Sequence, residues 1–180
     1  LPICQIAALT SGQLASLDDE HVAAIETGAL RGLTAAQVAS LAPAQAAAFT
    51  TDQIQALTAR QVAALDTAGL NALESDQIVA FTTDQIAALT RQQLSHLGEA
   101  QLVAIETDDI QALKGSQLSA FTTDQVRALL TEQLTSLLGA QIVALTSGQI
   151  SALTTDQVEA LTTDQLAALQ PSQLRSLTSR

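Results

Sequence analysis

The residues of this sequence best suited to chemistry are two histidines, one cysteine, and scattered hydroxyls and acids. His21 and His96 are far apart and lack the spaced cysteines or carboxylates that complete a metal site. Cys4 is the only cysteine, so no internal disulfide is possible. We interpret it as a tolerated surface substitution, with an intermolecular crosslink as the alternative.

The serines and glycines suggest no catalytic machinery either. The serines follow a repeat and lie in no strand–turn–helix elbow, which a serine nucleophile of the α/β-hydrolase kind requires. The glycines are scattered and form no phosphate-cradling loop. The sequence therefore predicts no catalytic, cofactor-binding or metal-binding residue, and a protein that is not an enzyme.

What positions these residues is an eight-residue repeat. From Pro2 to Leu177 the chain divides into 22 octads without insertion or deletion, the mark of a repeat array. The octad from Thr154 to Leu161 reads TTDQVEAL, and the next reads TTDQLAAL. We number the places of the octad 1 to 8, so that Thr154 is at place 1 and Leu161 at place 8.

Places 5 and 8 predict a buried helix face. Place 8 is large and apolar throughout, and place 5 is Ile, Val or Leu except at Ala46. Residues three apart share one side of a helix. Place 7 is small except at His96, which would let neighbouring backbones approach closely. Place 6 varies freely, as a solvent-facing site would.

The front of the octad predicts a helix start. Thr at place 1 is a good N-cap, and Gln at place 4 completes the capping-box spacing. Pro43 and Pro171 both lie at place 2, the first helical position, where proline is tolerated. Place 3 often carries an acid, which the helix dipole stabilises there; weak divalent-cation binding along such a row is the alternative. These acids are Asp52, Asp76, Asp84, Asp124, Glu132, Asp156 and Asp164.

Each octad is thus predicted to be a cap followed by a helix of about two turns, and the whole chain an all-α solenoid. In one continuous helix the apolar stripe would move by about 80° per octad, and the composition and period are wrong for strands. Short helices need neighbours to be stable. We predict one repeat domain over residues 2–177, with 178–180 beginning a truncated further repeat.

The size of one solenoid coil is indicated only faintly. TTDQ copies begin at Thr50, Thr82, Thr122 and Thr154, which are four or five octads apart. Arg31, Arg60, Arg91 and Arg127 recur about every four octads. A coil of four or five octads explains this beat; duplication of longer blocks also explains it, and helical hairpins of two octads are a further possibility.

Composition limits the partners. The net charge is −11, from 18 acidic and 7 basic residues, which argues against binding nucleic acid or an anionic membrane surface. No apolar run is long enough to span a bilayer, and no signal peptide is apparent. Because the chain lacks methionine, we expect a processed product or part of a longer protein.

The ends and one internal region suggest contacts. Neither end carries a polar capping repeat, so we expect aliphatic end faces and end-to-end self-association, which builds a filament if it does not close. Leu130 and Leu138 replace the threonine cap, and the pairs Leu129–Leu130 and Leu137–Leu138 would form either a lateral contact patch or a locally repacked turn.

The octads resemble the LTTxQ(I/V)xAL repeat stretches of large bacterial secreted or cell-surface proteins, as Leu153 to Leu161 illustrates. The resemblance covers residues 2–177 and implies a bacterial extracellular or envelope setting, with no catalytic residues or cofactor to carry over. We therefore expect a structural module that acts as a stalk, spacer or filament-forming segment. The alternative is a scaffold that binds a protein or glycan partner.

Overall fold

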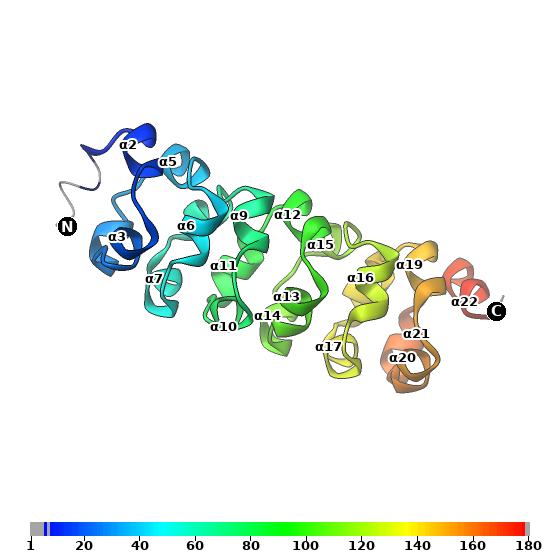
Figure 1. Ribbon diagram of the computed structural model, residues 1–180. Coiled ribbons are helices and arrows are strands. Elements are labelled where there is room, and N and C mark those ends of the chain that lie inside the picture. Colours follow the sequence, from blue (N-terminus) through cyan, green and yellow to red (C-terminus); the bar gives the residue numbers. More distant parts are fainter. Residues whose placement is uncertain (1–5, 7, 179–180) are drawn as a thin grey trace.

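A computed structural model of the chain describes residue 6 and residues 8–178, and within these residues all regular structure is helical (Figure 1). From residue 10 on, one short helix forms in each octad, as the repeat predicts. The helices are α2 (Ser11–Ala15), α3 (Asp19–Ala23), α4 (Thr27–Leu30), α5 (Ala35–Ala39), α6 (Pro43–Ala47), α7 (Thr51–Ala56), α8 (Ala59–Val62), α9 (Thr67–Asn71), α10 (Ser75–Val79), α11 (Thr83–Ala88), α12 (Arg91–His96), α13 (Glu99–Ala104), α14 (Thr107–Gln111), α15 (Gly115–Leu118), α16 (Thr123–Ala128), α17 (Thr131–Ser136), α18 (Gly139–Ala144), α19 (Ser147–Ala152), α20 (Thr155–Ala160), α21 (Thr163–Ala168) and α22 (Pro171–Thr178).

The helix starts are confirmed at place 1. Thr154 has an extended backbone (φ −70°, ψ 166°), and its hydroxyl accepts a hydrogen bond from the Gln157 N–H at 3.2 Å. Pro43 and Pro171 are the first residues of α6 and α22. The caps Glu26, Glu74 and Glu106 make no side-chain cap bond, in line with the weaker capping of glutamate; Asp18 and Asp66 do make one.

The helices are shorter than the two turns expected. From α2 to α21 each has four to six residues, because place 8 leaves the helix as well as place 1. Leu161, for example, has φ −54° and ψ 131°. Two consecutive extended residues redirect the chain, and no described residue has a positive φ. The turns between octads therefore need no glycine.

One coil of the solenoid holds between three and four octads. The main packing partner of each helix is the helix three places along, as in α6 with α9 and α19 with α22. Side-chain hydrogen bonds reach the helix four places back, as from Gln61 in α8 to Leu30 in α4. The predicted coil of four or five octads was therefore too large, and hairpins of two octads were wrong. Figure 1 shows the coils stacked along an elongated body, with the termini at opposite ends.

The core is a continuous aliphatic column along the inside of the coils, as places 5 and 8 predict. Ile86 at place 5 is 1% exposed and Leu89 at place 8 is 3% exposed. Place 7 packs closely against place 2 of an octad in the adjacent coil: a Cβ added at Gly139 (place 2) would lie 3.2 Å from the Cβ of Ala168 (place 7) in α21. A small residue at place 7 therefore lets the coils approach closely, as predicted.

The uncapped glutamates give a first prediction. We expect Glu74→Thr to raise the free energy of unfolding by about 1 kcal/mol, because the hydroxyl can give the Gln77 N–H a second acceptor beside the Glu74 carbonyl oxygen, to which it donates at 3.0 Å. Urea unfolding followed by circular dichroism measures the change. Glu159→Thr removes the same charge from an exposed site at place 6 and should not stabilise. Equal effects of the two substitutions would contradict the capping explanation.

Candidate functional site: the glutamine ladder

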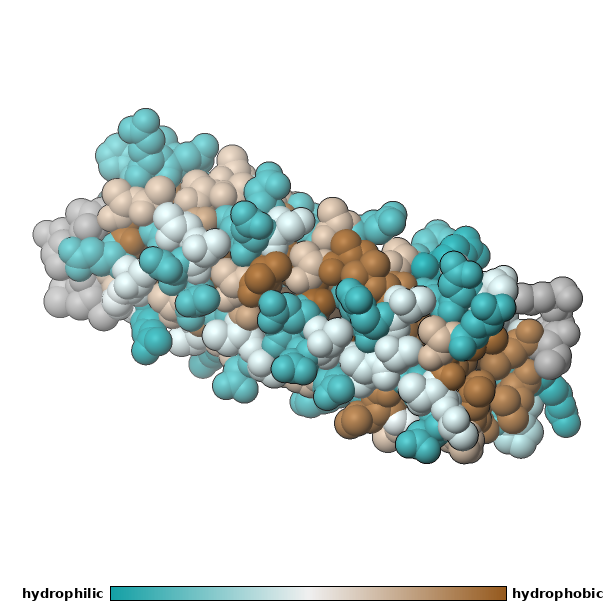
Figure 2. Space-filling model, turned by 90° about the horizontal axis from the view of Figure 1, so that it is seen from below, coloured by the Kyte–Doolittle hydropathy of each residue, from teal (hydrophilic) through white to brown (hydrophobic). Residues whose placement is uncertain are grey.

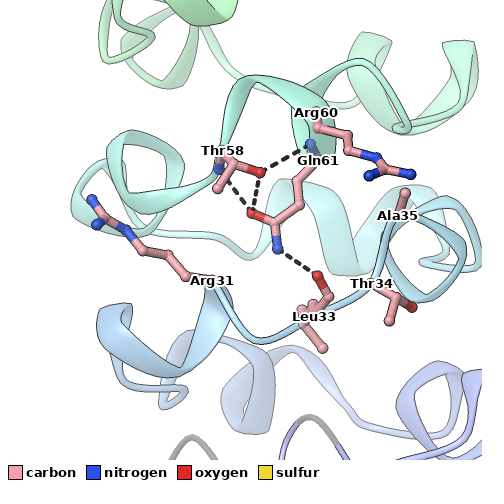
Figure 3. Close-up of a pocket in the computed structure, with 7 residues that line it drawn as sticks. All are labelled: Arg31, Leu33, Thr34, Ala35, Thr58, Arg60 and Gln61. Carbon is pink, nitrogen blue, oxygen red and sulfur yellow. Dashed lines mark hydrogen bonds between the residues drawn. The ribbon is translucent and has the colours of Figure 1, made fainter.

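The most distinctive site of the molecule is a buried glutamine that joins one coil to the next. Gln61 is 3% exposed (Figure 3). Its Oε1 accepts hydrogen bonds from the N–H and hydroxyl of Thr58, at 2.8 and 2.9 Å. Its Nε2 donates to the carbonyl oxygens of Leu30 and Leu33 in the preceding coil, at 2.7 and 2.8 Å. One amide therefore closes the start of its own helix and the end of another.

The same bridge recurs along the described chain. The place-4 glutamines from Gln37 to Gln173 each accept a hydrogen bond from the backbone N–H of their own place-1 residue. Each also donates to the place-8 carbonyl 28 residues earlier, at 2.6–3.1 Å. We call this set the glutamine ladder: Gln37, Gln45, Gln53, Gln61, Gln77, Gln85, Gln93, Gln101, Gln117, Gln125, Gln133, Gln141, Gln149, Gln157, Gln165 and Gln173.

Glutamine suits this position for a chemical reason. A helix leaves its first N–H groups and last carbonyls without internal partners, and in helices of four to six residues these groups are a large share of the backbone. An amide side chain supplies an acceptor for the N–H and two donors for the carbonyls. A carboxylate has no donor, and asparagine is one methylene shorter. Within the described residues, no buried side-chain N or O atom lacks a hydrogen-bond partner.

The sequence predicted half of this role. The capping box explained Gln at place 4, but the bridge to the preceding coil was missed. A signal for it was present: place 4 remains Gln where place 1 has no hydroxyl, as at Ala42, Gly98, Leu130 and Leu138. There the Gln side chain still accepts a hydrogen bond from the place-1 N–H, so its role does not depend on a threonine hydroxyl at place 1.

The ladder is interrupted at His21, Ala29, Gly69 and Asp109, which occupy place 4 instead of Gln. Asp109 is only 6% exposed, although its side chain lacks the amide N–H groups with which the ladder glutamines donate across the coil boundary. It lies 28 residues after Phe81, at the spacing that the ladder glutamines bridge.

Restoring the missing glutamine bridge at position 109 should therefore stabilise the protein. We expect Asp109→Gln to raise the free energy of unfolding by about 1–2 kcal/mol, because an amide replaces a buried carboxylate and can reach the Phe81 carbonyl. Thermal unfolding followed by circular dichroism measures the gain. Asp108→Asn removes the same charge from the exposed neighbouring position. A similar gain from this control would attribute the effect to net charge and not to the rung.

A second bond links the coils in the opposite direction. Arg31, Asn71 and Gln111 at place 6 donate to backbone carbonyls 25 residues later, at 3.3, 2.6 and 2.6 Å. The acceptors belong to place 7 of the octad three along. Place 6 is thus outward-facing, as predicted. In these three octads its side chain also forms a hydrogen bond to the adjacent coil.

Shallow grooves lie between the coils. One of about 320 Å³ is lined by Arg31, Leu33, Thr34, Ala35, Thr58, Arg60 and Gln61. The equivalent residues 32 positions later line a second groove of about 260 Å³. Figure 3 shows the side chains of Arg31 and Arg60 directed to opposite sides of Thr58 and Gln61. They do not converge on a common point, so the groove is a repeated feature of coil stacking.

The residues considered for chemistry lie apart from each other. His21 and Asp18 form an exposed pair, with 2.6 Å between Nδ1 and Oδ1, and the His21 N–H bond lowers the pKa of Asp18. His96 is exposed, with its Nδ1 2.8 Å from the carbonyl oxygen of Gln92. Cys4 lies outside the described residues. Within them no three His, Cys, Asp or Glu side chains gather as a metal site would need, and the place-3 acids are exposed.

The two leucine caps do not repack their turns. Leu130 and Leu138 are 41% and 57% exposed, and each N–H is bonded to the ladder glutamine of its own octad. The prediction of a repacked turn was therefore wrong, whereas a lateral contact patch at these exposed leucines stays a prediction.

Comparisons with known proteins agree with this architecture. No curated protein matches the chain. In the described part of the chain, no helix combines the length and apolar character needed to cross a membrane. Among protein families, the ALTTAQ repeat matches four segments, residues 22–59, 59–91, 102–138 and 139–163, which together cover well over half of the sequence. The chain therefore belongs to the ALTTAQ repeat family.

Proposed function

We propose that this repeat module is structural, a stalk, spacer or filament-forming segment of a bacterial surface or secreted protein. The observation that carries the proposal is the glutamine ladder. The same bond joins neighbouring coils from Gln37 to Gln173, apart from the interruptions at Gly69 and Asp109, so length can be changed by adding octads without a new kind of contact. Solenoids of this kind behave as nearest-neighbour stacks.

The last coil supports end-to-end growth. Leu166 and Leu174 at place 5 are 38% and 41% exposed, whereas the equivalent Leu94 is fully buried by the following coil. Figure 2 shows hydrophobic residues gathered toward the C-terminal end of the molecule. The carbonyls of Leu153 and Leu161 occupy the place-8 position that the ladder uses as acceptor elsewhere. Further octads, from the same chain or from a second copy, would cover these leucines and extend the ladder.

Analytical ultracentrifugation and electron microscopy test this growth. We expect the wild-type chain to form longer rods as its concentration rises, and Leu166→Ser/Leu174→Ser to stay short, since the end face loses its apolar contact. Leu138→Ser is the matched control, because Leu138 is 57% exposed on the side of the solenoid. Compact wild-type monomers at high concentration, or equal growth of the end-face variant, would overturn the filament proposal.

A protein- or glycan-binding scaffold is the second candidate. The observation that favours it is the free variation of place 6 on the outer surface, for example Gln55 and Val79, which are both exposed. A pull-down abolished by changes at place 6, with the fold intact by circular dichroism, would support this role over a purely structural one.

A further inference from the structure

The winding of the coils separates the charges of the chain into two faces. The octads of α2, α5, α8, α12, α15, α19 and α22 contain no Asp or Glu, although the chain has 18 acidic residues. We call these octads the carboxylate-free face: residues 10–17, 34–41, 58–65, 90–97, 114–121, 146–153 and 170–177. They carry four of the seven basic residues, all exposed: Arg60, Arg91, Lys114 and Arg175.

This face is continuous along the solenoid. Helix α2 packs on α5, α5 on α8, α12 on α15, and α19 on α22. The ladder closes the remaining steps: Gln93 of α12 bonds to the Leu65 carbonyl after α8, and Gln149 of α19 bonds to the Phe121 carbonyl after α15. Most of these helices are labelled along the upper edge of the molecule in Figure 1.

The opposite edge is acidic. We call the octads of α3, α7, α10, α14, α17 and α20 the acid face: residues 18–25, 50–57, 74–81, 106–113, 130–137 and 154–161. These helices follow the lower edge in Figure 1. They contain no Lys or Arg and twelve of the 18 acidic residues: Asp18, Asp19, Glu20, Asp52, Glu74, Asp76, Glu106, Asp108, Asp109, Glu132, Asp156 and Glu159.

The ion pairs His21–Asp18 and Arg127–Asp124 do not involve Arg60, Arg91 or Lys114, so these three basic groups are available to a partner. The carboxylate-free face also holds ten of the 13 serines. Short hydroxyl side chains let a second surface come close, and no carboxylate repels an acidic partner there.

We propose that copies of this solenoid associate side by side, with the carboxylate-free face of one against the acid face of the next. Complementary charge steers such an encounter and fixes its register. Because the two faces are formed by different octads of each coil, each contact leaves one face of each kind free for another copy. A heterologous contact of this type does not close and builds an array.

A second copy fits better than an unrelated acidic partner because of the spacing. The acids of the acid face recur once every three or four octads, and Arg60, Arg91 and Lys114 lie in octads that are four and three apart, so both kinds of charge follow the coil spacing in the middle of the array. Another solenoid of the same kind presents charges at the same interval along its length. This contact joins copies side by side, perpendicular to the solenoid axis, so it is independent of the end-to-end growth proposed above.

Sedimentation velocity at two salt concentrations tests the proposal. At about 0.01 M salt the screening length is about 30 Å and at about 1 M it is about 3 Å. We expect lateral assemblies at low salt that dissociate at high salt. Leu166→Ser/Leu174→Ser should still form them, since it affects only the end face.

Charge substitutions identify the faces. Arg60→Gln/Arg91→Gln/Lys114→Gln should abolish low-salt assembly. The matched control, Ala44→Glu/Thr83→Glu/Ala100→Glu, makes the same change in net charge at exposed positions outside both faces and should still assemble. Arg60→Glu/Arg91→Glu/Lys114→Glu should assemble again when mixed with Asp52→Lys/Asp76→Lys/Asp108→Lys. Circular dichroism confirms that each variant folds.

Several results would overturn the proposal. One is a wild-type chain that stays monomeric at low salt, and another is an equal loss in the control variant. Assembly that is indifferent to salt would point to the apolar end faces instead. A monomeric chain that binds poly-L-glutamate through Arg60, Arg91 and Lys114 would assign the face to an external polyanion and not to a second copy.

Discussion

A Gln85→Glu variant is expected to lose about 3–5 kcal/mol of its free energy of unfolding at neutral pH. Gln85 is 2% exposed, and its Nε2 donates to the carbonyl oxygens of Ile54 and Leu57 at 2.8 and 2.6 Å. A carboxylate of the same shape has no donor and places negative charge against two carbonyl oxygens. A buried charge without a partner typically costs this much. Urea unfolding followed by circular dichroism at neutral pH gives the value.

The loss should shrink as the pH falls. Burial and the facing carbonyls raise the pKa of the new carboxyl in the folded state above the value of about 4.3 for an exposed glutamate. The folded protein then binds more protons than the unfolded one between these two pKa values. The stability of the variant relative to wild type must therefore rise as the pH drops through that window. The protonated carboxyl can also donate one hydrogen bond to a carbonyl.

The control for this variant is Gln55→Glu. Gln55 lies at place 6 of the octad that contains the acceptors Ile54 and Leu57, and its side chain is exposed. The same change in net charge there should alter stability by less than about 0.5 kcal/mol, with no comparable gain at low pH. Equal losses in the two variants, or a loss that does not depend on pH, would show that the ladder amide is not needed.

Much of the fold could be predicted because its signals lie within eight residues. A cap at Thr154 and its partner Gln157 are three residues apart, and the apolar places 5 and 8 share one side of the same short helix. Local physics fixes both. The single helix per octad, the place-8 core and the close approach of the coils at a small place 7 all follow from such short-range patterns, and the structure confirms them.

The coil size lay beyond this range. It depends on the angle between successive helices, which the backbone at places 8 and 1 sets together. Small differences in these backbone angles decide whether an octad contacts the one three places further along the chain or the one four places further. The repetition of TTDQ at Thr50 and Thr82 suggested four octads, whereas the packing places the coil between three and four. The bridging role of Gln61 was missed for the same reason, since its acceptor lies 28 residues away.

The charge faces show how a long-range fold gives meaning to a scattered pattern. Read along the sequence, acids such as Asp52, Asp76 and Asp108 are spread without an evident plan. Wrapped at three to four octads per coil, they fall on one side of the solenoid, and seven of the octads without acids form another. Neither composition nor net charge could reveal this separation, because both are unchanged by where the chain turns.

The second large effect is expected for Leu89→Asp, which should cost several kcal/mol and melt the array locally. Leu89 is 3% exposed at place 8 in the aliphatic column, and its carbonyl oxygen accepts the ladder bond of Gln117 at 2.7 Å. An aspartate there would be a buried charge without a partner. Because each coil is stable only through its neighbours, we expect the helices beside Leu89 to lose structure before the ends of the array.

Hydrogen exchange resolves this loss along the chain. Amides in α8 and α14, which pack on either side of α11, should exchange faster in the variant, whereas those of α19 to α22 should keep most of their protection. Leu138→Asp, at a site that is 57% exposed, is the control and should leave exchange nearly unchanged. If Leu89→Asp kept the helicity and melting temperature of the wild type, burial at place 8 would not stabilise the coils. If protection from exchange instead fell equally along the whole array, the array would unfold as one cooperative unit. Contacts between neighbouring coils alone would then not describe its stability.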